Sequence, residues 1–172
     1  ENLLSITRIG SDQASITKSP EAAEEVLGEA AQKFRRRFPQ VSVSVTAPES
    51  LLFVPMDPIL IAQVLSNLLE NAVLHGETTT LIRLSVRQSG SFARFSVQDN
   101  GQGISEKALS TLFDGTLKHS ETPSGDGNRN MGLGLSVCLA IVRAHGGTME
   151  AHNLKTGAEF SFQLPLYEEE SK

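Results

Sequence analysis

The sequence predicts an α+β fold, a two-layer α/β sandwich in which helices cover one face of a mixed β-sheet. Segments with helical spacing and segments with alternating apolar residues are interleaved along the chain. The last two strands, expected over residues 148–152 and 159–164, are close enough in sequence to form a hairpin. An antiparallel hairpin at the end argues against a doubly wound parallel sheet and favours a mixed one.

Composition divides the chain into three parts. Residues 1–19 are expected to be the end of a helix and a polar linker, residues 20–166 one folded domain, and residues 167–172 an acidic tail. The length of 172 residues and the 39% hydrophobic content suit a single domain with its own core. The 15 basic against 20 acidic residues give a net charge of −5, which argues against a broad nucleic-acid surface.

The folded part is expected to open with a helix from Pro20 to about Phe38. Ser19 suits its N-cap, and Pro20 suits the first helical position, where the missing N–H costs nothing. Valine and serine alternate over residues 41–45, which predicts a half-buried strand. Residues 51–54 are expected to be the partner of that strand.

The second half contains a long loop that is rich in Gly, Ser, Thr and Asn, over residues 114–130. So long a loop in a compact domain is usually functional. The remaining elements are expected as a helix over 57–75, strands over 81–88 and 92–98, and helices over 106–113 and 133–145. The single cysteine, Cys138, follows the helical spacing of its apolar neighbours and is expected in the core.

A stripe of polar residues follows the long, otherwise apolar helix. Gln63, Asn67, Asn71 and His75 are spaced by four and therefore share one face. Such a stripe either faces water or lines a site. Lysine and glutamate are better helix formers than asparagine, so the choice of amides favours a site. An asparagine oxygen is a hard, neutral ligand of the kind that suits Mg²⁺.

Asp99 is predicted on the apolar side of its strand, because every second residue from Ala93 to Val97 is apolar. A buried carboxylate without partners costs roughly several kcal/mol, so a ligand with an N–H donor, such as a purine amino group, would suit it. The alternative is a tight turn, since Asp-Asn-Gly is strong turn chemistry. Gly101 and Gly103 would let the backbone come close to a flat ligand.

A second glycine segment, residues 130–135, directly precedes the last predicted helix. Glycines at a helix N-terminus expose backbone N–H groups and favour an anion, whereas the alternative is a flexible hinge. The spacing excludes a P-loop, because no Gly-Lys-Ser/Thr follows, and the glycines do not follow the first strand of a βαβ unit.

In this order, these segments resemble the sequence boxes of the GHKL superfamily, which includes histidine kinases, gyrase-type topoisomerases, Hsp90 chaperones and MutL. The resemblance covers residues 20–166. It places the N box at 67–71, the first glycine box at 99–103, the F box at Phe113, the second glycine box at 132–135 and a last glycine segment at 156–157. Residues 54–58, 130–138 and 144–147 look most like KdpD-type potassium-sensing kinases.

This resemblance implies a Bergerat-type domain that binds Mg-ATP and donates the γ-phosphate to a histidine of its own dimerisation domain. Asn71 would coordinate Mg²⁺, Asp99 would bind the adenine amino group, and residues 114–130 would form the ATP lid. Asn67 stands where ATPase members carry a catalytic glutamate, which favours transfer over hydrolysis. The resemblance implies further nucleotide contacts at Asn67, Glu70, His75, Gly101, Gly103, Ile104, Phe113, Lys118, Arg129, Asn130, Met131, Gly132, Leu133, Gly134 and Leu135.

The resemblance also implies the setting of the domain. It would be the cytoplasmic part of an inner-membrane-anchored bacterial sensor, monomeric in isolation, without direct membrane or nucleic-acid contact, and a response regulator would be a second partner. None of the four histidines resembles the phosphoacceptor, which is expected upstream.

Three positions depart from the kinase pattern: Leu74 replaces a frequent Lys, Thr116 replaces a frequent Phe, and Lys118 replaces a frequent Arg. An ATPase-type switch, a nucleotide-binding regulatory module without transfer activity, and an anti-sigma serine kinase remain alternatives.

Overall fold

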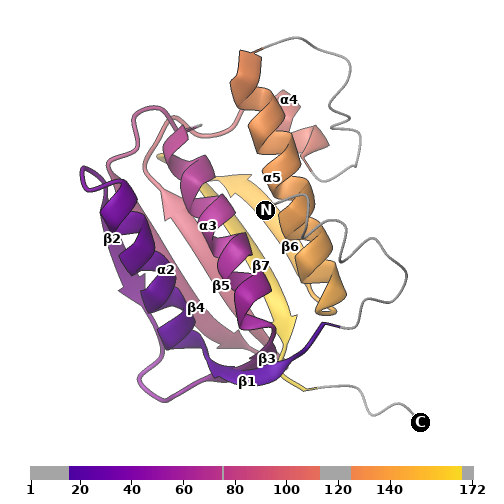
Figure 1. Cartoon of the computed structure of the whole chain (residues 1–172). Coiled ribbons are helices and arrows are strands. Elements are labelled where there is room, and N and C mark those ends of the chain that lie inside the picture. The colour runs from indigo at the N-terminus through magenta and orange to yellow at the C-terminus, as the bar shows by residue number, and fades with distance from the viewer. Residues whose placement is uncertain (1–15, 75, 113–124, 168–172) are drawn as a thin grey trace.

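The computed structural model describes residues 16–74, 76–112 and 125–167, without the side chains of 111 and 125–133. Helices α2 (Ala23–Arg37), α3 (Pro58–Leu74) and α5 (Gly125–Ala144) lie side by side on one face of a five-stranded sheet (Figure 1). The sheet has the order β2-β4-β5-β7-β6, and its strands are β2 (Ser42–Thr46), β4 (Leu81–Ser89), β5 (Phe92–Asp99), β6 (Thr148–Asn153) and β7 (Ala158–Pro165). The predicted two-layer α+β fold is confirmed. The helix end predicted over 1–9, most of the linker and the tail from 168 lie outside the described residues.

The sheet is mixed, because β2 pairs with β4 in parallel while the other neighbours are antiparallel. The expected pairing of residues 51–54 with 41–45 was wrong. Strand β3 (Phe53–Met56) pairs instead with β1 (Ser19–Ala22), in a separate antiparallel ribbon where Pro20 lies opposite Pro55. Proline cannot donate to a central ladder, so an isolated two-stranded ribbon is a suitable place for both.

The start of the first long helix also differs from the prediction. Ser19 and Pro20 belong to β1, and α2 begins at Ala23, whose N–H donates to the Leu52 carbonyl at 2.9 Å. The Ser19 hydroxyl bonds to Glu21 at 2.7 Å and caps no helix. The backbone groups of residues 19–22 form their hydrogen bonds with β3. The local pattern of Ser19 and Pro20 cannot reveal this distant partner.

The core lies between the sheet and the three helices. The rings of Phe95 and Phe162, from neighbouring strands, stack with centroids 4.8 Å apart and are fully buried against the helical layer. Cys138 is buried in α5, as predicted, and burial raises the pKa of its thiol to about 12. The thiol is therefore protonated and part of the packing at neutral pH.

Helix α5 begins at Gly125, whereas the glycine-rich sequence predicted a loop up to residue 130 and a helix only from 133. Each residue added to an existing helix gains a hydrogen bond, so a well-packed helix can extend through poor helix formers. As a result, Gly132 and Gly134 lie inside the helix and not at its N-terminus. Residues 113–124, which make up most of the rest of the predicted loop, lie outside the described residues.

His145 joins the end of α5 to the start of α3. Its Nε2 accepts the Asp57 N–H at 3.0 Å, and its Nδ1 lies 2.8 Å from the Ile141 carbonyl, so Nδ1 carries the proton. The Asp57 carboxylate in turn accepts from the N–H groups of Ile59 and Leu60 and caps α3. Burial lowers the pKa of His145 below its usual 6.5, and this arrangement requires the neutral ring.

This link predicts that acid destabilises the fold. Because the pKa of His145 is lower in the folded than in the unfolded chain, its contribution is fully present above pH 6.5 and is lost as the pH falls through the folded value. Urea unfolding between about pH 7.5 and 5.5 should therefore show a smaller loss of stability in His145→Gln than in the parent. The parent chain measured at the same pH values is the reference. An equal loss in His145→Gln and the parent would contradict this role.

Candidate functional site: a polar cavity between α3, β5 and β7

A small cavity lies where the last turns of α3, the end of β5 and the start of β7 meet. Its volume is about 20 Å³, and its lining combines two buried polar side chains with apolar and glycine surfaces. The lining residues are Asn71, Gly76, Asp99, Gly103, Ile104, Ala158 and Phe160. Segments far apart in sequence therefore converge on Asn71 and Asp99, the two residues that the sequence singled out for metal and base.

Asp99 is the last residue of β5 and is only 7% exposed. Its Oδ1 accepts the Gly101 N–H at 2.8 Å. Burial raises the pKa of the Asp99 carboxyl above its usual 3.8, and hydrogen bonds from the backbones of Gly101 and Ala158 act in the opposite direction. A carboxylate held in this way retains acceptor capacity towards the cavity, because each carboxylate oxygen has more than one lone pair.

The turn after Asp99 is real as well. The Asn100 side-chain oxygen accepts the N–H groups of Thr80 and Leu81, both at 3.0 Å, and its nitrogen donates to the Thr80 hydroxyl at 2.9 Å. The two interpretations of Asp-Asn-Gly both apply to Asp99, because its buried carboxylate also accepts the Gly101 N–H within the turn. Asn100 ties this segment to the start of β4.

Asn67 and Asn71 of the polar stripe on α3 face α5 and the cavity, not water. Asn67 and Asn71 are each 7% exposed. Asn67 accepts from the Gln63 amide at 2.9 Å and donates to the Gly134 carbonyl of α5 at 3.4 Å. The Asn71 nitrogen has no hydrogen-bond partner among the described residues. A buried amide with an unused donor is costly in a fold and points to a ligand.

Glycines let the backbone close around Asp99. Gly157 has a φ of +87°, and a Cβ there would lie 1.9 Å from the Asp99 carbonyl oxygen. A Cβ at Gly101 would lie 2.7 Å from the Gly76 carbonyl oxygen, so this approach also requires glycine. Sequence reasoning missed Gly76, Ala158 and Phe160 as lining residues, although a glycine just after a predicted helix is a recognised signal of a helix end.

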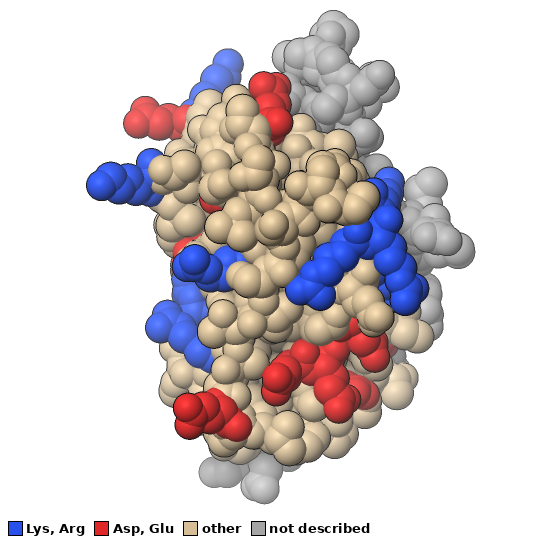
Figure 2. Space-filling view, turned by 90° about the vertical axis from the view of Figure 1, so that its left-hand side faces the viewer, with Lys and Arg blue, Asp and Glu red and all other residues tan. Residues whose placement is uncertain are grey.

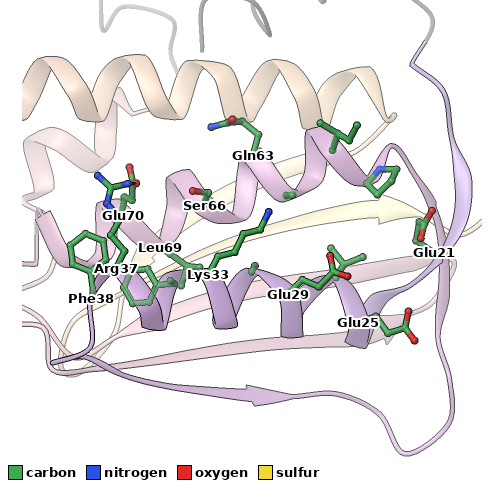
Figure 3. Close-up of a pocket in the computed structure, with 16 residues that line it drawn as sticks. Glu21, Glu25, Glu29, Lys33, Arg37, Phe38, Gln63, Ser66, Leu69 and Glu70 are labelled. Carbon is green, nitrogen blue, oxygen red and sulfur yellow. Dashed lines mark hydrogen bonds and ion pairs between the residues drawn. The ribbon is translucent and has the colours of Figure 1, made fainter. Parts of the chain in front are cut away.

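Glu70 lies elsewhere. Neighbouring residues of a helix are rotated by about 100°, so Glu70 points away from the Asn71 cavity. It forms an ion pair with Arg37 of α2 and lines a separate cavity of about 550 Å³ between α2 and α3 (Figure 3). Glu25 and Glu29 also extend from α2 at the rim of this larger cavity.

The larger cavity offers no comparable cradle for a charged ligand. On the side of the molecule that lies at the left of Figure 1, acidic and basic side chains form small separate clusters (Figure 2). Such a mixture gives no single-sign field that would attract a phosphate. Of the predicted nucleotide contacts that are described, only Glu70 lines this cavity.

Several predicted contacts cannot be placed. His75, Phe113 and Lys118 lie outside the described residues, and α5 carries Arg129, Asn130, Met131, Gly132 and Leu133 with side chains that are not described. Leu135 is buried at 1% exposure, and Gly134 contributes its carbonyl to Asn67. Gly103 and Ile104 line the cavity together with Asp99.

The sequence of the chain matches a known protein family. The sequence model of the "Histidine kinase-, DNA gyrase B-, and HSP90-like ATPase" family matches residues 56–168, which is more than half of the chain and includes every cavity residue. The chain belongs to this family. As a member of the histidine kinase-like ATPase family it binds ATP, and the cavity holds the two residues that the resemblance assigned to base and metal.

Similar proteins within the family are sensor kinases. The chain is 40% identical to the sensor protein KdpD of Clostridium acetobutylicum and 35% identical to that of Escherichia coli, over 96% and 95% of its own length. It spans only 18% of the length of each. The adaptive-response sensory kinase SasA of Synechocystis is 30% identical over 97% of the chain and 44% of its own length.

Solved structures of histidine kinase domains of this ATPase family have the same fold. The catalytic domain of the histidine kinase ThkA matches with a TM-score of 0.70 and 26% identity, covering 87% of this chain and 95% of that one. The ATP-binding domain of PrrB from Mycobacterium tuberculosis matches with a TM-score of 0.71 and 25% identity, covering 88% and 99%. The chain is therefore a catalytic domain of the histidine kinase type.

Within the described part of the chain, no helix is both long and apolar enough to cross a bilayer. No three His, Cys, Asp or Glu side chains of the described residues gather into a cluster that could hold a metal ion.

Proposed function

We propose that the cavity between α3, β5 and β7 holds Mg-ATP and that the chain donates the γ-phosphate to a histidine on its own dimerisation domain. The observation that carries this proposal is the pairing, in one cavity, of a buried carboxylate with a buried amide whose nitrogen has no hydrogen-bond partner among the described residues. The carboxylate would recognise the base. The amide would recognise the phosphate end, because its N–H suits a phosphate oxygen and its oxygen suits the metal.

Asp99 suits the adenine amino group. Its carboxylate already accepts from two backbone N–H groups, and a third donor from the ligand would stabilise the charged form that burial disfavours. Ile104 and Phe160 supply apolar surface next to it for the flat ring. A volume of about 20 Å³ has room for about one water, so the ring must displace part of the wall as it enters.

Asn71 suits Mg²⁺, which commonly takes one or two protein oxygens and completes its shell with water and phosphate. The ion would bridge phosphate oxygens and offset the charge that develops during transfer. A single neutral oxygen from Asn71 is enough for this role, and it agrees with the absence of a three-residue acidic or histidine cluster among the described residues.

Asn67 argues for transfer over hydrolysis. An amide has no basic site for a proton from water, and both ends of Asn67 are already bonded, to Gln63 and to the Gly134 carbonyl. Its position favours a structural link between α3 and α5 over the activation of water. The nucleophile must therefore be brought by a partner, and positioning contributes much of the rate of such reactions.

The phosphates would meet the N-terminal part of α5. Gly125, Gly127, Gly132 and Gly134 lie in this helix, and each glycine costs a helix about 1 kcal/mol relative to alanine. Unwinding of these turns would free backbone N–H groups for an anion at small cost. A membrane-anchored cytoplasmic sensor and a response regulator as second partner belong to the same proposal.

Incubation with γ-labelled ATP tests the function. The chain alone should bind Mg-ATP, hydrolyse it slowly and stay unlabelled, and a dimerisation domain supplied in trans should become labelled on histidine. Strong labelling of the chain alone, at His75, His119, His145 or His152, would show that the acceptor was misplaced. Binding without labelling of the partner would instead support a regulatory module, and fast hydrolysis an ATPase switch.

A further inference from the structure

Two cross-strand neighbours at the end of the β6–β7 hairpin reach the nucleotide cavity by different routes. Asn153 and Ala158 are register partners in this hairpin. Ala158 lines the cavity, and its backbone bonds to the Asp99 carboxylate. The Asn153 side chain reaches another lining residue, Ile104, where its Oδ1 accepts the Ile104 N–H at 2.7 Å and its Nδ2 donates to the Ile104 carbonyl at 2.6 Å.

The contact between Asn153 and the Gly103–Ile104 wall is tight. Gly103 has a φ of +82°, and a Cβ there would lie 2.9 Å from Oδ1 of Asn153. Both backbone hydrogen-bonding groups of Ile104 are satisfied by this one side chain. The Leu154 N–H closes the hairpin turn on the Gly157 carbonyl at 3.0 Å, so Asn153 projects from an ordered hairpin end.

The geometry points to Asn153 as a positioning residue that sets the separation between the Ile104 wall and the Asp99 carboxylate, and thereby the width of the slot for the base. Asn153 does not line the cavity itself and acts through Ile104. Because Asn153 and Ala158 are paired across the hairpin, one hairpin end supports Ile104 through the Asn153 side chain and the Asp99 carboxylate through the Ala158 backbone. This inference rests on the proposed binding of ATP in the cavity.

Asn153→Ala should release the Ile104 wall and lower the affinity for ATP, ADP and adenosine by the same factor, roughly tenfold, because the wall is no longer ordered before binding. Equal factors are expected since the slot concerns the base and not the phosphates. Asn153→Asp keeps the acceptor for the Ile104 N–H but sets a second acceptor against the Ile104 carbonyl, so it should lose at least as much affinity as the alanine variant. The affinities are measured by calorimetry, and urea unfolding of each variant reports whether it is folded.

A double-mutant cycle shows whether Asn153 acts through the wall. Gly103→Ala places a Cβ against the Asn153 amide, so it should lower the adenosine affinity strongly in the parent and much less in Asn153→Ala, where that amide is absent. The φ strain at residue 103 is common to both backgrounds and cancels. His152→Ala, at the half-exposed neighbour on β6, is the control and should bind adenosine like the parent.

The outcomes separate the two proposals. A parent chain that binds neither ATP nor adenosine refutes the proposed function. A parent that binds, together with folded Asn153 variants of unchanged affinity, refutes only the role of Asn153. A loss confined to ATP and ADP, or strictly additive effects in the cycle, would also overturn that role.

Discussion

Asp99→Asn is expected to lower the ATP affinity roughly 10- to 100-fold, because it leaves a buried group mismatched at a cost of about 1–3 kcal/mol. The neighbours of the carboxylate are the N–H groups of Gly101 and Ala158, and the adenine amino group would join them in the proposed complex. All of them are donors. An amide turned either way must direct its NH₂ at one of these donors, so no rotamer restores the parent pattern.

Calorimetry with ATP and with adenosine measures this loss, which should appear for both because the contact is to the base. Asp57→Asn is the matched control, since Asp57 carries the same charge but caps the far end of α3, where an asparagine also accepts the N–H groups. It should bind ATP like the parent. An unchanged affinity in Asp99→Asn would remove Asp99 from the site.

The pH dependence of affinity gives a second measurement on the same variant. Burial raises the pKa of Asp99 above 3.8, and a protonated carboxyl loses acceptor capacity. The adenosine affinity of the parent should therefore fall as the pH is lowered towards that raised pKa, and it should fall more than that of the asparagine variant. Adenosine is the better probe here because it has no phosphate, and protonation of its own ring nitrogen is common to both proteins and cancels in the comparison.

The sequence predicted the elements whose pattern is local. Alternation placed β4 and β5 and turned Asp99 inward, and helical spacing placed Asn67 and Asn71 on one face of α3. These patterns depend only on the periods of strands and helices, so they predict which side chains share one face of an element. The family resemblance then assigned Asn67, Asn71 and Asp99 to one nucleotide site.

The elements that the sequence mispredicted depend on distant partners. Residues 19–22 have a strong helix-start pattern, yet pairing with β3 makes them a strand. The glycines of α5 signal a loop, yet helix continues through them from the packed C-terminal part. Ala158 contributes only its backbone to the site, and Asn153 reaches the site because the two residues are paired across the hairpin. Neither property can be predicted from a single sequence.

Asn71→Leu is expected to lower the rate of phosphotransfer to the dimerisation domain by about 100-fold or more. The folded variant should be as stable as the parent or more stable. Leucine has the same branched heavy-atom shape as asparagine, so it can fill the same space. The variant removes the one buried side-chain nitrogen that has no partner among the described residues, and such a group costs roughly 1–3 kcal/mol. The melting temperature should rise by about 2–4 °C for each kcal/mol recovered.

Opposite effects on stability and activity distinguish a ligand-binding residue from a structural one, because a residue retained for packing would lose both together. Asn67→Leu is the matched comparison on the same stripe of α3. Asn67 is bonded to Gln63 and to the Gly134 carbonyl, so its replacement should lower the melting temperature.

Adenosine binding should survive in Asn71→Leu, since Asp99 still recognises the base, and the gain in affinity that Mg²⁺ gives to ATP should disappear. Magnesium-dependent transfer at the parent rate in Asn71→Leu would show that the metal is held elsewhere, and a fall in its melting temperature would show that the amide has a structural partner.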